Sequence, residues 1–262
     1  MKNVYTIILC GGRGSRLGSL GKSIPKSMVK VFKKPLIWYI IANLYHKGFR
    51  KFILPLGYKG KIIKNYIENE FIDNNNKFSD CEFFLINTGE NSSVSKRFIK
   101  IKKVIKESTD FFIVNGDTFF DFNYLDMYYK HVKEKNMLTL ASTIVYSKYG
   151  LIEEKNNKIT NFIKKMSISS FQIEKLSNSI YYVNAGFVIL KSNFTNYITL
   201  NNELEFEDQV FSKLIKLNKA SRYKIDGDWF AVETQKDLLE INDVNSYIGS
   251  KVLKKLNLLE KI

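Results

Sequence analysis

The stretch 7–28 constrains this chain more than any other segment. An apolar, β-branched run at 4–9 leads into it and predicts a buried strand. The strand is followed by three glycines, Gly11, Gly12 and Gly14. Glycine permits a positive φ and lets backbone N–H groups approach a ligand closely. Arg16 and Lys26 come next, and a strand that ends in a glycine loop with two cations is suited to binding a polyphosphate.

Two familiar phosphate loops do not match this stretch. A Walker A loop ends in Gly-Lys-Ser/Thr, whereas Gly14 is followed by Ser15 and Arg16. The dinucleotide fingerprint GxGxxG would begin at Gly12, but Leu17 stands at its third glycine position and no helix obviously starts there. The remaining alternative is an ordinary glycine turn at the end of a strand.

The length allows one large α/β domain or two small ones, and we favour one. The chain has 262 residues, 45% of them hydrophobic, and no Pro/Gly/Ser-rich linker divides it. Cys10 and Cys81 lie far apart with no CxxC or Cys/His cluster, which argues against disulfides and zinc and favours a reducing cytoplasm. The chain runs straight into its first strand, so we expect no signal peptide. No apolar run reaches the ~18 residues of a membrane-spanning helix.

The formal net charge of +15 allows three kinds of anionic partner: nucleic acid, a membrane surface or a small anionic substrate. The lysines are spread along the whole chain rather than gathered in one block. We therefore expect no nucleic-acid partner, although a basic nucleic-acid binder remains an alternative. The positive field would still help to recruit a nucleoside triphosphate.

The first half alternates strands and helices. Apolar periodicity and turn residues predict helices at 35–47, 61–71 and 95–105, and further strands at 51–56, 82–86 and 110–114. This βαβαβαβ order predicts a doubly wound, mostly parallel sheet, whose ligands sit at the carboxyl ends of the strands. Gly11, Asn87 and Asp117 all follow such ends, so we expect them to face one cleft.

The second half predicts a mixed β region. We expect helices at 122–135, 203–217 and 235–248, and strands at 137–146, 150–154, 158–162, 180–190, 222–225 and 229–232. Asn156-Asn157 would form a hairpin turn. The tail 251–262 is amphipathic, with apolar residues at helical spacing, and could pack either on its own domain or on a second subunit.

The glycine loop resembles the signature of the sugar-nucleotidyltransferase family, L-A-G-G-x-G-T-R-L followed by P-K-P-M. The matching residues are Leu9, Cys10, Gly11, Gly12, Gly14, Ser15, Arg16, Leu17, Pro25, Lys26, Ser27 and Met28. Cys10 replaces Ala, Ser15 replaces Thr and Ser27 replaces the second Pro, and none of these changes removes a charge. The resemblance implies a Rossmann-like nucleotidyltransferase fold, with 1–121 as the nucleotide-binding half and 122–262 as the acceptor-binding half.

The resemblance also implies roles for the loop residues. Leu9, Gly11, Gly12, Gly14, Ser15, Arg16 and Lys26 would bind the nucleotide, and Arg16 and Lys26 would also be catalytic. Gly116 and Asp117 in N-G-D-T match the family's G-D metal site, so Gly116 would contact the nucleotide, and Asp117 would bind Mg²⁺ and act in catalysis. The alternative for Asp117 is a turn aspartate that caps the helix starting at Phe122, but Asp121 competes for that role.

A second carboxylate is needed beside Asp117. Many family members carry it in W-x-D-x-G-T, where this chain has Ala231. The glucose-1-phosphate cytidylyltransferases carry W-x-P-M-D-T, and Glu233 falls on that acid. The resemblance therefore implies that Glu233 shares the metal. The alternative is a residue that caps the following helix or lies in its first turn.

Two further segments resemble the cytidylyltransferase branch. Gly57-Tyr58-Lys59-Gly60 matches G-Y-K-G, and Asn87-Thr88-Gly89 with Arg97 matches D-T-G…T-x-T-G-G-R, which lines the base pocket. Thr88 and Ser95 would thus contact the nucleotide. The T-G-G positions hold Val94, Ser95 and Lys96, and the loss of both glycines weakens the assignment to CTP.

The acceptor segments match less closely. Phe162-Ile163-Lys164-Lys165-Met166 stands in place of F-x-E-K-P, so Lys165 would bind the acceptor phosphate. Asn184-Ala185-Gly186-Phe187 resembles N-G-G-F, so Asn184 and Gly186 would contact the sugar. The alternatives are an exposed lysine and an ordinary strand glycine.

Together these matches imply a Mg²⁺-dependent transferase that joins a nucleoside triphosphate, with CTP favoured, to a sugar 1-phosphate or a polyol phosphate and releases pyrophosphate. The acceptor phosphate is itself the nucleophile, which fits a chain whose two histidines lie outside every motif. The use of GTP, UTP or dTTP, and a non-catalytic regulatory homologue, remain alternatives. A homo-oligomer is compatible with the pattern.

Overall fold

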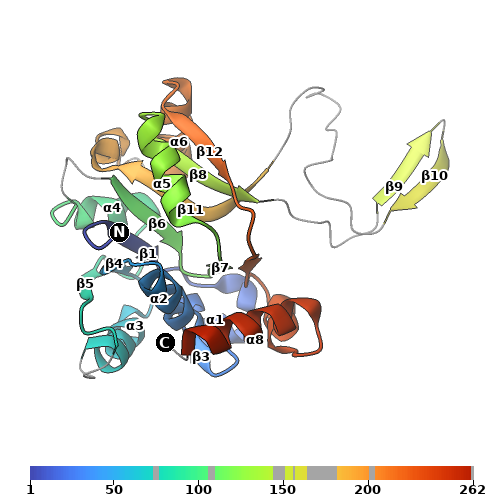
Figure 1. Cartoon of the computed structure of the whole chain (residues 1–262), viewed down its shortest axis with the longest axis horizontal. Helices are drawn as coiled ribbons and strands as arrows, with labels where there is room; N and C mark the ends of the chain where they lie inside the picture. Colours follow the sequence, from blue (N-terminus) through green and yellow to red (C-terminus); the bar gives the residue numbers. More distant parts are fainter. Residues whose placement is uncertain are drawn as a thin grey trace.

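A seven-stranded β-sheet forms the centre of the protein (Figure 1). The computed structural model describes residues 1–72, 77–105, 110–143, 151–155, 157–163, 182–200 and 204–260. The strands lie side by side in the order β12-β8-β11-β6-β1-β4-β5. Their bounds are Tyr5–Leu9 (β1), Lys51–Leu56 (β4), Glu82–Asn87 (β5), Asp110–Asn115 (β6), Leu138–Thr143 (β8), Val183–Lys191 (β11) and Ala220–Lys224 (β12).

The sheet is mostly parallel, as the sequence predicts. Strand β1 pairs in parallel with β4 and β6, β4 with β5, and β8 with β12. Only β11 runs antiparallel, to β6 on one side and β8 on the other. The strands of the second half therefore extend the sheet of the first half. The predicted hairpin also forms, from β9 (Leu151–Lys155) and β10 (Lys158–Ile163).

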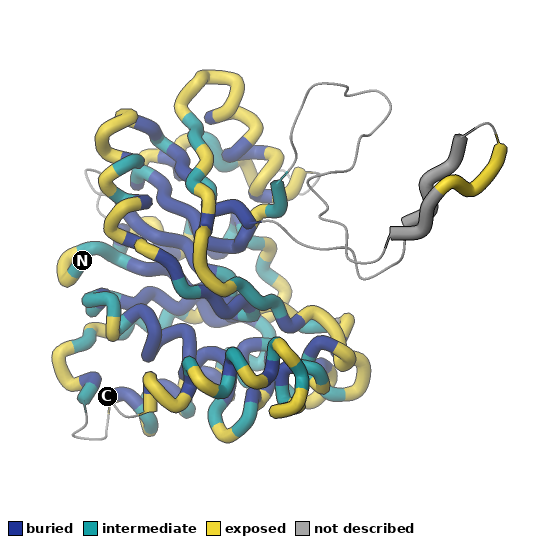
Figure 2. Tube along the Cα trace, turned by 45° about the vertical axis from the view of Figure 1, so that its right-hand side comes forward, coloured by how far each residue is buried: buried dark blue, intermediate teal, exposed yellow. Residues whose placement is uncertain are grey.

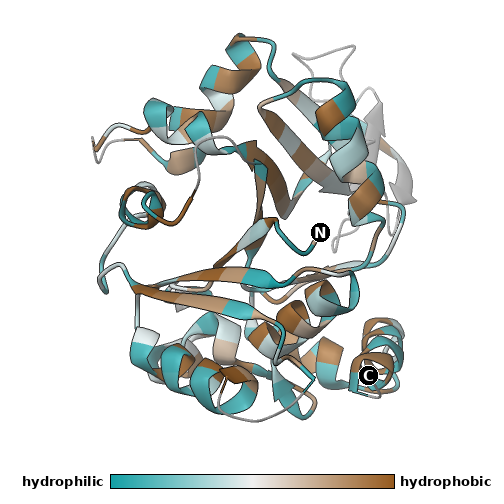
Figure 3. Ribbon diagram, turned by 60° about the vertical axis from the view of Figure 1, so that its left-hand side comes forward, coloured by the Kyte–Doolittle hydropathy of each residue, from teal (hydrophilic) through white to brown (hydrophobic). Residues whose placement is uncertain are grey.

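Helices cover both faces of the sheet, so the predicted doubly wound α/β class is confirmed. Alternation along the strands separates the two faces: Ile8 and Phe112 enter one buried cluster, and Ile7 and Phe111 the other. Figures 2 and 3 show the buried, apolar strands between helices whose outer surfaces are exposed and polar. The helices are Ser19–Ser23 (α1), Leu36–His46 (α2), Gly60–Ile67 (α3), Val94–Ile101 (α4), Tyr124–Lys133 (α5), Phe206–Lys216 (α6), Gln235–Asn242 (α7) and Tyr247–Glu260 (α8).

The structure corrects the sequence analysis in the glycine loop. A 3₁₀ turn at Ser15–Leu17 and the short helix α1 follow this loop, where the sequence indicated no helix. Further 3₁₀ turns at Lys26–Met28 and Ser192–Tyr197, a π turn at Glu68–Ile72 and a hairpin of β2 (Lys30–Val31) with β3 (Lys34–Pro35) also escaped prediction. These elements are too short to produce a clear hydrophobic period.

Two predictions about helix ends were wrong. Asn123, not Asp121, caps α5, because its side chain accepts a hydrogen bond from the Asp126 N–H. The helix expected at 235–248 ends at Asn242 and a new one begins at Tyr247. Ser246 stands at the break, and its hydroxyl bonds both the Gly249 N–H and the Glu240 carbonyl. Such side chains compete with helical backbone bonds and so end a helix.

A two-stranded ribbon lies beside the sheet, and half of it was not predicted. Strand β7 (Thr118–Phe120) pairs antiparallel with β13 (Trp229–Ala231), so that Thr118 faces Ala231. Asn43 of α2 supports the ribbon, because its buried amide donates to the Phe120 carbonyl over 2.8 Å. Because β7 starts directly after Asp117, the ribbon carries the predicted metal ligand at one end.

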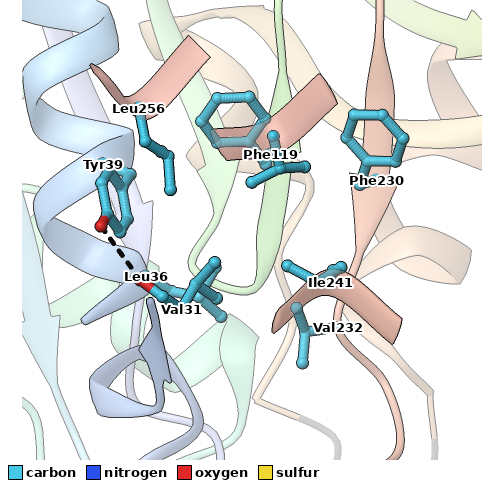
Figure 4. A pocket seen from close by; sticks show the side chains of 9 residues that line it. Val31, Leu36, Tyr39, Phe119, Phe230, Val232, Ile241 and Leu256 are labelled. Atoms are coloured by element: carbon cyan, nitrogen blue, oxygen red, sulfur yellow. Dashed lines mark hydrogen bonds between the residues drawn. The ribbon is translucent and has the colours of Figure 1, made fainter. Parts of the chain in front are cut away.

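Helix α8 packs on its own chain, where the sequence left a second subunit open. Val252, Leu256 and Leu259 are buried, and α8 lies against α2. In Figure 4, Leu256 converges with side chains from β2, α2, β7, β13 and α7. The apolar void between these side chains has a volume of about 10 Å³. This void is too small for a ligand, so it belongs to the core. No helix in the described ranges is long and apolar enough to cross a membrane.

We expect Leu256→Ala to lower the free energy of unfolding by about 2–5 kcal/mol, because it removes a side chain that is only 1% exposed and leaves a cavity. Urea unfolding followed by circular dichroism measures this change. Leu258→Ala is the matched control on the same helix, since Leu258 is 54% exposed and should change stability by less than about 0.5 kcal/mol. Equal losses in both variants would contradict the packing of α8.

Candidate active site

The glycine loop is held by close backbone contacts. Gly14 has a φ of 62°, and its carbonyl accepts the Leu17 N–H over 2.9 Å. A Cβ on Gly21 of α1 would lie 2.2 Å from the same carbonyl oxygen, so α1 packs directly against the loop. A Cβ on Gly14 would lie 3.0 Å from the Cβ of Lys26. The 3₁₀ turn at Ser15–Leu17 and the 3₁₀ turn at Lys26–Met28 are thereby brought together.

A buried arginine lies beneath the loop. Arg97 of α4 is 8% exposed, and its Nη2 donates to the Gly11 carbonyl over 2.9 Å. A Cβ on Gly11 would lie 2.8 Å from Arg97 Nη1, and a Cβ on Gly57 would lie 2.9 Å from Nη2. Only glycine leaves room for the guanidinium at both positions. Burial lowers the pKa of Arg97 and raises the pKa of the neighbouring Cys10 thiol to about 12; with only 2% of Cys10 exposed, this is the environment of a structural cysteine.

The first predicted cation and carboxylate meet at the ends of β1 and β6. Lys26 Nζ lies 2.5 Å from Asp117 Oδ2, and the two side chains are only 17% and 28% exposed. The neighbouring backbones are joined as well, since the Gly116 N–H donates to the Leu9 carbonyl over 3.1 Å. Gly116 has to be small, because its Cβ would lie 2.7 Å from that oxygen.

The second predicted cation and carboxylate also form an ion pair. Arg16 Nη1 lies 2.6 Å from Glu233 Oε2, with side chains that are 72% and 51% exposed. Glu233 is held near Asp117, because the Val232 N–H donates to the Asp117 carbonyl over 3.1 Å. Glu233 does not cap α7. Thr234 is the N-cap and forms a capping box with Asp237.

The two carboxylates suit a magnesium ion that is shared with a ligand. Across the described ranges, no group of three or more His, Cys, Asp or Glu side chains could hold a metal. Mg²⁺ does not need such a group, since it is usually bound by one or two carboxylates together with phosphate oxygens and water. Asp117 and Glu233 on adjoining strand ends are a donor set of that kind.

The structure buries both predicted base-side residues. Thr88 is fully buried, and its hydroxyl donates to the Leu56 carbonyl over 2.8 Å. Ser95 is 5% exposed, in the first turn of α4.

Gly12 of the glycine loop is open, because a Cβ at this position would meet no atom within 4 Å, so protein packing does not require a glycine there. Ser15 starts the first 3₁₀ turn.

The predicted acceptor residues lie on a bulge of β11. The pairing of β11 with β8 shifts between Asn184 and Val188, and Gly186 has a φ of 72°. Asn184 Oδ1 accepts the Gly186 N–H over 3.0 Å. The Trp229 indole donates to the Ala185 carbonyl over 2.8 Å, which links the bulge to β13 and so to Glu233. Lys165 lies outside the described residues.

Sequence reasoning missed the ion cluster at the far end of the ribbon. Asp121 lies beside Lys47 at the end of α2 and Lys255 of α8. Desolvation alone would raise the pKa of Asp121, but the two lysines outweigh it and the net shift is downward. The three charges are scattered along the chain, and no local motif indicates them.

Comparison with known proteins decides the family. The Nucleotidyl transferase family model matches residues 5–246, which include the glycine loop, Lys26, Asp117 and Glu233. The chain belongs to this family. The resemblance inferred from the glycine loop is thereby confirmed over nearly the whole chain.

Members of the family with several nucleotide specificities are similar to the chain. It is 27% identical over 250 residues to a probable glucose-1-phosphate cytidylyltransferase of Bacillus subtilis, covering 90% of this chain and 94% of the relative. It is 30% identical over 227 residues to the D-glycero-alpha-D-manno-heptose 1-phosphate guanylyltransferase of Campylobacter jejuni, covering 87% and 93%. The fold resembles the UTP-bound UGPase of Acinetobacter baumannii with a TM-score of 0.68 at 17% identity, covering 98% and 99%.

We expect Gly11→Ala to destabilise the protein by about 1–3 kcal/mol, because the new methyl group would overlap Arg97 and the Gly57 N–H. Gly12→Ala is the matched control, since its methyl group meets no atom within 4 Å. Thermal and urea unfolding of both variants measure the difference. Equal stability of the two would show that Arg97 does not require a glycine at position 11.

Proposed function

We propose that this protein is a Mg²⁺-dependent sugar-phosphate nucleotidyltransferase. A phosphate oxygen of the acceptor attacks the α-phosphorus of a nucleoside triphosphate, the bond to the β-phosphate breaks and pyrophosphate leaves. The observation that carries the proposal is the pairing of both predicted cations with both predicted carboxylates, Lys26 with Asp117 and Arg16 with Glu233, at adjoining strand ends.

These pairs have the charges that the reaction needs. A triphosphate would take Lys26 and Arg16 as its own partners, and the released carboxylates would bind Mg²⁺, which neutralises charge on the phosphates. Every charged group keeps an opposite partner in this exchange. Because the acceptor phosphate is itself the nucleophile, the reaction needs no covalent nucleophile from the protein, and catalysis rests on positioning and charge neutralisation.

Several features support CTP as the nucleotide. The acid at position 233 and the Gly57–Gly60 segment follow the cytidylyltransferase pattern. Arg97 has the place of the arginine in that branch, and its buried Nε has no hydrogen-bond partner among the described residues. GTP, UTP and dTTP remain the alternatives, since relatives named for other nucleotides match the chain equally well.

The acceptor is a sugar 1-phosphate or a polyol phosphate in this proposal. Asn184 and Gly186 on the β11 bulge would contact it, and Lys165 would bind its phosphate. We place the reaction in the cytoplasm, where nucleoside triphosphates are made and where the two free cysteines would stay reduced. A homo-oligomer is part of the proposal without a defined interface.

The test is a pyrophosphate-release assay of the purified protein with CTP, GTP, UTP and dTTP against a panel of sugar 1-phosphates and polyol phosphates, with Mg²⁺ or with EDTA. We expect turnover with CTP and one class of acceptor, and none with EDTA. Turnover with another nucleotide would overturn the assignment of CTP but not the assignment of nucleotidyltransferase activity. Nucleotide binding without turnover against the whole panel would favour a regulatory homologue, consistent with Ala231 and the lost glycines at 95 and 96.

We expect Glu233→Gln to reduce turnover on the order of 10- to 100-fold and to raise the Mg²⁺ concentration for half-maximal rate, because the amide is a poorer metal ligand. Mg²⁺ titration of the steady-state rate measures both effects. Asp228→Asn is the matched control, since Asp228 precedes β13 and pairs with Lys251 of α8 at 2.8 Å. A larger loss in Asp228→Asn than in Glu233→Gln would overturn the metal assignment.

A further inference from the structure

Arg13 occupies the variable position of the glycine loop, between Gly12 and Gly14. Its Nη2 donates to Asn91 Oδ1, and its Cζ lies 5.4 Å from the centre of the Tyr58 ring. Tyr58 follows β4 and Asn91 follows β5. One side chain from the loop after β1 therefore contacts the loops after the next two strands of the sheet.

We call these three residues, Arg13, Tyr58 and Asn91, the Arg13 strap. Both of its far ends lie on loops that are ordered by other bonds. The Tyr58 N–H donates to the Gly11 carbonyl over 3.2 Å, and its hydroxyl donates to the Lys22 carbonyl over 3.2 Å. The loop that carries Asn91 folds back on itself, since the Ser92 N–H donates to the Gly89 carbonyl over 3.2 Å.

The strap runs along the edge where the nucleotide would lie. In the proposed function, on which this inference rests, the triphosphate sits at the glycine loop after β1 and the base sits at the loop after β5. Strand β4 lies between these two strands. The strap spans the same three strand ends in the same direction. It thus joins the part of the site that would hold the phosphates to the part that would read the base.

We propose that the Arg13 strap positions the base-side loop for nucleotide binding. Without it, the position of the Asn91 side of that loop relative to the glycine loop would have to be fixed when the nucleotide binds, and fixing it then would weaken binding. Arginine suits this task because its planar group stacks on a ring through its face and donates hydrogen bonds through its edge. A single exposed hydrogen bond and one ring contact add little to global stability, so the role is local.

The competing explanation is that Arg13 is only one more cation for the triphosphate. The two explanations differ in what they require of Asn91, which carries no charge. A strap needs both ends, whereas a phosphate-binding cation acts without Asn91. A lysine at position 13 also separates them, since it keeps the charge but has no planar group to stack and bond in two directions.

The experiment is a double-mutant cycle of Arg13→Ala and Asn91→Ala, with Arg13→Lys as a third variant. Isothermal titration calorimetry gives the Kd for each of the four nucleoside triphosphates with Mg²⁺, and steady-state kinetics gives KM and kcat. Asp80→Ala is the matched control, because Asp80 bonds Arg50, whose Cζ lies 3.9 Å from the centre of the Tyr45 ring near the amino end of β4.

If the three residues act as a strap, we expect each single variant, including Arg13→Lys, to raise the nucleotide Kd about 5- to 10-fold. The double variant should raise the Kd no further, because the effects of substitutions at coupled residues are not additive. The preference for the best nucleotide over the second best should fall. The value of kcat, the acceptor KM and the melting temperature should stay close to wild type, as should every value for Asp80→Ala.

The strap is overturned if Asn91→Ala binds nucleotides with wild-type affinity while Arg13→Ala binds them more weakly. It is also overturned if the increases in Kd of the two single variants multiply in the double variant, or if Arg13→Lys keeps wild-type affinity. Failure of the proposed function looks different. If wild-type protein binds nucleotides without turnover, the Kd cycle still decides the strap. If it binds none of the four nucleotides, the proposed function and the strap are both overturned.

Discussion

The contact of one buried guanidinium with two glycines underlies the rest of the site. Arg97 fills the space below the glycine loop and bonds the Gly11 carbonyl, which the backbone after β4 also reaches. Glycines at positions 11 and 57 are the only residues that allow this approach. The carboxyl ends of β1 and β4 are therefore held together from below. Gly12 lies open on the same loop, where the nucleotide of the proposed function would bind.

The ion pairs Lys26–Asp117 and Arg16–Glu233 depend on elements that contribute no predicted site residue themselves. Asp117 and Glu233 are close because β7 and β13 form a ribbon, and the ribbon is braced by Asn43 of α2 and by the lysines around Asp121. Helix α8 covers the same region from outside. We therefore expect damage to α8 to appear in catalysis as well as in stability.

How far the sequence predicts the site depends on the range of the contacts involved. The loop around Gly14 could be predicted, because a positive φ and a close turn are local demands. Asp117 was placed correctly at the end of β6, since apolar periodicity finds a buried strand. Asp121 was misassigned as a helix cap, because its partners, Lys47 and Lys255, are remote in sequence. The burial of Thr88 was missed for the same reason.

The sequence by itself determined the α/β class, the alternation of strands and helices in the first half and a glycine loop with its cations, because these depend on short-range periodicity and on glycine. The tertiary structure alone decided which charge meets which. Lys26 and Asp117 are 91 residues apart, and Arg16 and Glu233 are 217 apart. Local propensities do not predict contacts between residues that are so far apart in the sequence. Only the packing of strands and ribbon, driven by burial of apolar surface, brings these side chains to one edge of the sheet.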